Sequence, residues 1–130
     1  MSQSSAASPI PGTPEQWLEH AKSDLALAEI APIPPGVLLE SLCFHAQQAA
    51  EKAIKAVLVS RGITFKLVHD IAYLSELMPS VPMEVEDAAE LNVYAVELRY
   101  PAVLSSPTEA EKKTAIEQAR AVVRWAEAEI

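Results

Sequence analysis

Proline placement is the feature that most constrains how this chain can fold. The ten prolines stand in four groups, at residues 8–14, 32–35, 79–82 and 101–107, with long proline-free stretches between them. Proline lacks a backbone N–H and disfavours helix in the residue before it, so each group marks a connection. The stretches between the groups are rich in Ala, Glu and Leu, which are among the best helix formers, and glycine occurs only three times. The pattern therefore predicts helices joined by proline-containing connections.

The length of the chain limits how these helices can be organised. With 130 residues, 50% of them hydrophobic, it can form one domain with a real core but is too short for two of ordinary size. We predict an all-α, up-and-down bundle of four to five helices over residues 13–130, after a flexible tail at residues 1–12. The expected helices span about residues 14–31, 37–61, 70–78, 83–100 and 108–130.

Several helix ends carry specific signals. Thr13 with Gln16, and Thr108 with Glu111, have the spacing of capping boxes, and Pro14 suits the first helical position. Gly62 can take the left-handed conformation that closes a helix. Asp70 is expected to cap the short third helix.

Charge and cysteine content exclude some classes of protein. A formal net charge of −8 argues against a general nucleic-acid coat, which needs many Lys and Arg contacts. The single cysteine, Cys43, excludes an intramolecular disulfide and suits a reducing compartment. The first residues lack the charged and apolar regions of a secretory signal, and no apolar run approaches membrane-spanning length. We expect a cytoplasmic protein with no membrane association.

The stretch "FHAQQAAEKAIKA", residues 44–56, lies in the longest expected helix. At about 100° per residue, one broad arc of this helix is apolar and wide enough to meet two or more neighbouring helices. Its alanines would let a partner helix approach closely. The arc consists of Leu38, Leu39, Leu42, Ala46, Ala49, Ala50, Ala53 and Val57.

A second stripe of the same helix is polar and contains no acid. His45, Gln48, Lys52 and Lys55 follow one another at spacings of three, four and three residues, so they share one narrow face. The charges from His45 to Lys66 sum to +3 (four cations minus one anion) in a chain of net charge −8. Two interpretations stay open: an ordinary solvated helix face, or a site for phosphate or another anion.

The expected fourth helix places Asn92 and Arg99 within its apolar face. A buried Arg is costly without a partner, so Arg99 would meet a carboxylate, a ligand or another subunit. Alternatively its last-turn position favours the helix dipole and allows the side chain to reach water.

No metal or cofactor site is predicted. The histidines at 20, 45 and 69 have no i, i+4 pair, and there is neither a Gly-rich phosphate loop nor a marked serine nucleophile.

Three ordered stretches, "FHAQQAAEKAIKAVLVSRG", "VHDIAYL" and "VYAVELRYP", resemble the successive signatures of HEPN domains over residues from about 14 to 128. The resemblance implies a helical bundle similar to the helical, substrate-binding domain of kanamycin nucleotidyltransferase, often homodimeric. It also implies a gene neighbour encoding a minimal nucleotidyltransferase, frequently as a toxin–antitoxin pair. Some members cleave RNA without a metal, and others are proposed to bind nucleotides.

The ribonuclease members of that family use an Arg followed about a turn later by a His. Here the matching residue is Arg99, but Tyr100, Pro101, Ala102 and Val103 follow, and no histidine occurs after His69. This departure favours a noncatalytic role, although His45 or His69 could approach Arg99 in the fold.

The resemblance and the polar stripe together favour a noncatalytic, nucleotide- or phosphate-binding partner of a minimal nucleotidyltransferase. The alternatives are a toxin ribonuclease with a degenerate or relocated active site, and a purely structural dimerisation module. Expected ligand contacts are Lys52, Lys55 and Arg99 to phosphate, His45 and Gln48 for orientation, and Tyr100 for stacking.

Overall fold

The computed structural model describes residues 11–99 and 106–130, and for residues 96–99 it describes the backbone only. Most of the expected N-terminal tail and Tyr100 lie outside the described residues. Within them the chain is helical and contains no strand, which confirms the all-α prediction. The elements are α1 (Pro14–Ala28), α2 (Leu39–Ser60), α3 (Ile71–Glu76), α4 (Met83–Asp87), the 3₁₀ helix η1 (Ala88–Leu91), α5 (Asn92–Arg99) and α6 (Glu109–Glu129).

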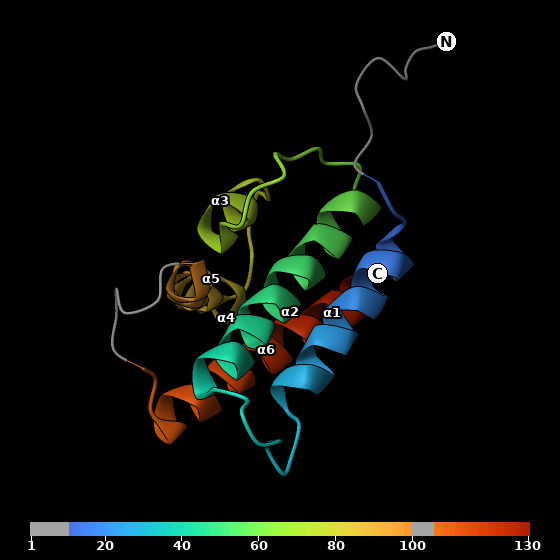
Figure 1. The fold of residues 1–130 in the computed structure, drawn as a ribbon. Coiled ribbons are helices and arrows are strands. Elements are labelled where there is room, and N and C mark those ends of the chain that lie inside the picture. Colours follow the sequence, from blue (N-terminus) through green and yellow to red (C-terminus); the bar gives the residue numbers. More distant parts are fainter. Residues whose placement is uncertain (1–10, 100–105) are drawn as a thin grey trace.

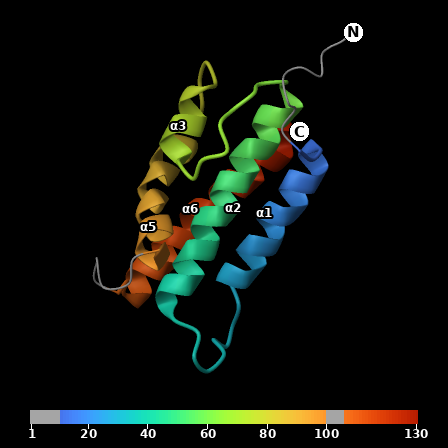
Figure 2. The same cartoon turned by 45° about the horizontal axis from the view of Figure 1, so that its top comes forward.

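The helices form an up-and-down bundle around α2. Figure 1 shows α1 and α2 side by side in opposite directions, with α6 behind them. After the turn of Figure 2, α3 and α5 form a column on the side of α2 away from α1. Accordingly, α2 contacts α1, α6, α5 and α3. The prediction that this helix is central is confirmed.

The alanine-rich arc of α2 forms much of the core. Ala46, Ala49, Ala50 and Ala53 are fully buried. The prediction that Leu38 belongs to this packed arc is wrong, because α2 begins only at Leu39 and Leu38 is 56% exposed. On α6 the buried residues form one apolar stripe: Ala115, Ile116, Ala119, Val122, Val123 and Ala126.

Most predicted helix ends are confirmed. Both capping boxes form, at Thr13 with Gln16 and at Thr108 with Glu111. Gly62 has φ +72°, and the Ile63 amide donates to the Leu58 carbonyl at 2.9 Å, which closes α2. The first helix ends at Ala28 instead of about Ala31, because Pro32 cannot donate the hydrogen bond that a longer helix would need.

The fourth helix was predicted to be continuous, but the structure shows that it is interrupted. It is divided into α4, the 3₁₀ turn η1 and α5. The break places Asn92 beside the start of α3, where its Oδ1 accepts a hydrogen bond from the Ile71 amide (3.0 Å) and its Nδ2 donates to Asp70 Oδ1 (3.0 Å). The same Asp70 oxygen accepts from the Tyr73 amide at 3.2 Å, so the predicted cap is confirmed.

None of the described helices combines the length and apolar character needed to cross a membrane.

Candidate functional site

The polar side chains of α2 form the most unusual chemical feature of the described structure. We call this set the α2 polar face: His45, Gln47, Gln48, Glu51, Lys52 and Lys55. A helix face of this composition is ordinarily solvated, yet Gln48 is 8% exposed and Lys55 only 4%. The interpretation of the predicted stripe as an ordinary solvated face is therefore wrong for Gln48 and Lys55, whereas the side chains of His45 and Lys52 are partly exposed.

Asp24 of α1 joins one end of this face. Its Oδ1 lies 2.9 Å from His45 Nδ1, and its Oδ2 accepts a hydrogen bond from Lys52 Nζ at 2.7 Å. The His45 ring also meets Phe44 edge-on, with 5.5 Å between ring centroids. The imidazole is thus fixed from two directions, while its side chain stays 33% exposed.

Glu51 organises the other end. Although only 1% exposed, its carboxylate accepts hydrogen bonds from Gln47 Nε2 at 3.0 Å and from Lys55 Nζ at 2.7 Å. His69 Nδ1 lies 3.1 Å from each carboxylate oxygen. Gln48 Nε2 donates to Gln47 Oε1 at 2.7 Å, which extends the network along the helix. These buried polar groups satisfy one another.

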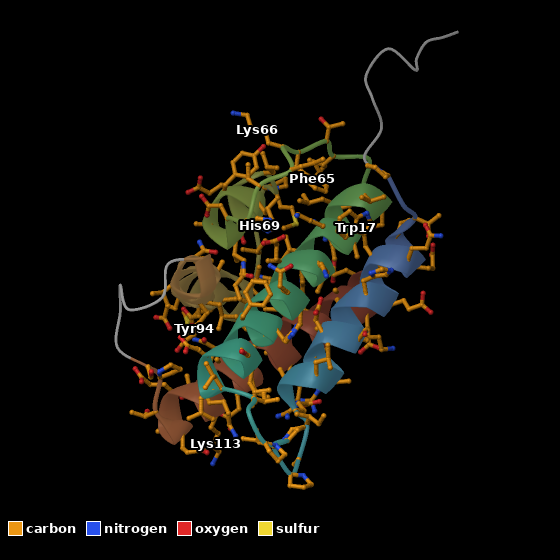
Figure 3. All side chains as sticks on the ribbon, viewed as in Figure 1. Trp17, Phe65, Lys66, His69, Tyr94 and Lys113 are labelled. Atoms are coloured by element: carbon orange, nitrogen blue, oxygen red, sulfur yellow. The ribbon has the colours of Figure 1, made fainter. Side chains whose placement is uncertain are left out.

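Aromatic rings cover Lys55. Its Nζ lies 5.4 Å from the Trp17 ring centroid and 5.8 Å from that of Phe65, a range in which cation–π attraction operates. The two rings meet edge-to-face at 6.4 Å. In Figure 3 Trp17 lies on α1, whereas Phe65 lies on the connection above α2. Lys55 is therefore enclosed between a carboxylate and two aromatic rings.

His69 is the more exposed of the two histidines that meet carboxylates. It stands in the connection before α3, in the space between α2 and α3 (Figure 3), and its side chain is 55% exposed. Where Nδ1 donates to a carboxylate, the neutral imidazole keeps Nε2 as an acceptor on its far side. His45 and His69 can therefore each offer a ring nitrogen to a ligand.

Sequence reasoning found His45, Gln48, Lys52 and Lys55 but missed the two carboxylates that pair with them. The sequence position of Asp24 could have indicated its burial: it stands three residues after Ala21 on the apolar stripe of α1, a position that a solvated acid would avoid. The position of Glu51 could have indicated its pairing with Lys55, because it precedes Lys55 by four residues, the favoured order for a helical ion pair.

The other two expected ligand residues fall outside the side chains that the structure describes. Tyr100 lies outside the described residues; Arg99 is the last residue of α5, and its side chain is among those that are not described. Among the described residues, no group of three or more His, Cys, Asp and Glu side chains could hold a metal ion.

Comparison with known proteins points to one family. The family model described as the HEPN domain matches residues 14–129. The crystal structure of TT1696 from Thermus thermophilus is similar at 28% identity with a TM-score of 0.75, over 90% of this chain and 98% of that one. The crystal structure of ST0689, an archaeal HEPN homologue, is similar at 29% identity with a TM-score of 0.71, over 90% of this chain and 97% of that one. Comparison with curated proteins gives no match.

Proposed function

The chain belongs to the HEPN domain family, and from this premise we propose that it is a noncatalytic nucleotide-binding partner of a minimal nucleotidyltransferase. It acts as a homodimer in a two-gene module of the toxin–antitoxin kind. The ligand binds along the α2 polar face, where His45 and Lys52 remain partly exposed and His69 lies beside Glu51.

The observation that carries this proposal is the prearranged state of that face. Asp24 fixes His45 and Lys52, and Glu51 fixes Lys55 and His69. Side chains that are already ordered lose little further conformational entropy when a ligand arrives. The absence of a histidine after Arg99 in the sequence supports binding without RNA cleavage.

Calorimetric titration tests the binding. Wild-type protein should bind ATP or GTP, and His45→Ala or Lys52→Ala should weaken binding by about tenfold, the loss of roughly one good interaction. Lys113→Ala is the matched control, because Lys113 is an exposed lysine on α6 (Figure 3) and should leave affinity unchanged. No binding of either nucleotide, with or without the nucleotidyltransferase encoded beside it, would overturn the proposal.

Assembly is tested separately. Light scattering of the purified chain should give twice its 14.0 kDa mass, and co-expression with the neighbouring nucleotidyltransferase should yield a complex that copurifies. A monomer that does not copurify with that enzyme would contradict the partner role, whatever the result of the nucleotide titration.

His69 supports a second candidate, a metal-independent ribonuclease with a relocated histidine. A buried carboxylate that orients a partly exposed imidazole is the arrangement that a general acid or base requires. This candidate predicts growth arrest on expression, relieved by His69→Ala and by Arg99→Ala. Normal growth and intact RNA on expression of the wild-type chain would exclude it.

A further inference from the structure

The positive charges of the α2 polar face are already matched by carboxylates. Lys52 Nζ lies 2.7 Å from Asp24, and Lys55 Nζ lies 2.7 Å from Glu51. The Asp24 side chain is 11% exposed, compared with 25% for Lys52 and 33% for His45. Asp24 therefore lies beneath the two side chains that a ligand would meet first.

This pairing matters for an incoming phosphate. A phosphate that contacts Lys52 also comes close to the Asp24 carboxylate, because the phosphate and the carboxylate would both contact the ammonium group of Lys52. Coulomb energy falls only with the inverse of distance, so repulsion from the carboxylate cancels much of the attraction to the lysine. Lys52 paired with Asp24 therefore adds little net attraction for an anion.

Hydrogen bonding and stacking remain available at the same place. Lys52 has three N–H donors and uses one on Asp24, while His45 uses Nδ1 there and keeps Nε2. The His45 ring is held by Asp24 and by the edge contact with Phe44, so it offers a fixed flat surface. An uncharged group with ring atoms, hydroxyls or amides matches these features better than a phosphate does.

We propose that the His45 end of the α2 polar face binds the nucleoside part of the ligand, and that Asp24 is the specificity-determining residue that keeps phosphate away from it. This inference rests on the proposed nucleotide-binding function. It reverses the expected role of Lys52, from a phosphate contact to a hydrogen-bond donor for the base or the ribose.

Parallel titrations with adenosine, AMP and ATP test the inference. Wild-type protein should bind adenosine and ATP with affinities within about threefold of each other, and with little dependence on salt. Asp24→Asn leaves the Lys52 charge unmatched, so it should bind ATP about tenfold more tightly while adenosine binding does not improve. A wild-type preference for ATP of about tenfold or more that Asp24→Asn leaves unchanged would overturn the inference.

A second variant keeps the test valid if Asp24→Asn fails to fold, which circular dichroism would reveal. Lys52→Gln should weaken adenosine binding, since the nucleoside loses a hydrogen bond, and should weaken ATP binding at least as much, because the Asp24 carboxylate is then unmatched. Unchanged adenosine binding would show that Lys52 does not contact the nucleoside and would refute the inference. Lys113→Gln, which removes an exposed lysine on α6, is the control for the change in net charge. If wild-type protein binds none of the three compounds, it is the proposed function that fails.

Discussion

Glu51 shows how single residues shape this molecule. Its carboxylate is almost fully buried, yet it accepts hydrogen bonds from Gln47 and Lys55 and lies against His69. A buried charge is tolerated only where opposite charge and hydrogen bonds replace the lost water. The two ends of the α2 polar face, centred on Glu51 and Asp24, obey this rule in the same way.

Removal of the Glu51 carboxylate should therefore destabilise the fold. Glu51→Ala leaves the Lys55 ammonium buried without its anion, and such a loss costs about 3–5 kcal/mol of unfolding free energy. Glu51→Gln keeps the volume and a hydrogen-bond acceptor, so its cost should be clearly smaller. Urea unfolding measures the free energy of unfolding of both variants. Glu19→Ala is the matched control, because Glu19 is an exposed acid on α1. Equal stability of wild type and Glu51→Ala would contradict the view that Glu51 supports Lys55.

Residue types and their spacing predicted one face of α2 but not its environment. His45, Gln48, Lys52 and Lys55 do share a face, and helical periodicity is sufficient to show that. Which side chains meet them depends on the packing of α1 and of the 61–70 connection against α2, and those contacts span up to 28 residues of sequence. Local periodicity contains no information about such distant partners.

At the scale of elements, Asn92 joins two short helices that would be marginal alone. Its side chain accepts from the Ile71 amide, one of the unpaired N–H groups at the start of α3, and donates to the Asp70 cap. Helices as short as α3 and α5 depend on such tertiary contacts for stability. The 3₁₀ turn before Asn92 thus serves to place this side chain.

Asn92→Ala should loosen the start of α3. It removes two hydrogen bonds and leaves the Ile71 amide without its partner, at a cost of about 1–3 kcal/mol. Thermal unfolding measures the global loss, and hydrogen exchange of the Ile71 amide measures the local one. Asn92→Asp keeps the acceptor but places a carboxylate beside Asp70, so added salt should partly restore its stability. Unchanged protection of the Ile71 amide in Asn92→Ala would contradict this role.

Helix ends were predictable because caps are local chemistry. Thr13, Thr108, Asp70 and Gly62 each act as their sequence neighbours indicated. The division of the fourth helix was not predictable, because its apolar residues keep helical spacing through the break. The break coincides with the hydrogen bond between Asn92 and Ile71, which lie 21 residues apart in the sequence.

For the whole molecule, the question is what holds α6 against the other helices. Lys22 pairs with Glu127 at 2.7 Å, Arg61 with Glu129 at 2.6 Å, and Arg120 with Glu29. All three pairs are at least one-third exposed, and exposed pairs contribute little to stability. The apolar stripe of α6, which includes Ala119 and Val122, is buried, and it should contribute most of the attachment.

A comparison of two changes tests this conclusion. Replacing Lys22, Arg61 and Arg120 together by Gln should cost about 1.5 kcal/mol, since each of the three exposed pairs contributes about 0.5 kcal/mol, the middle of the range of about 0–1 kcal/mol. Val122→Ala alone should cost about 2 kcal/mol, because it removes buried methyl groups and leaves a cavity at a fully buried position of α6. Urea unfolding should therefore show that one apolar truncation is at least as damaging as the loss of three ion pairs. In 1 M NaCl, which screens surface charges, the difference in unfolding free energy between wild type and the triple variant should disappear, while the loss caused by Val122→Ala should persist. A triple variant that is much less stable than Val122→Ala would show instead that charge pairing at the surface holds α6 in place.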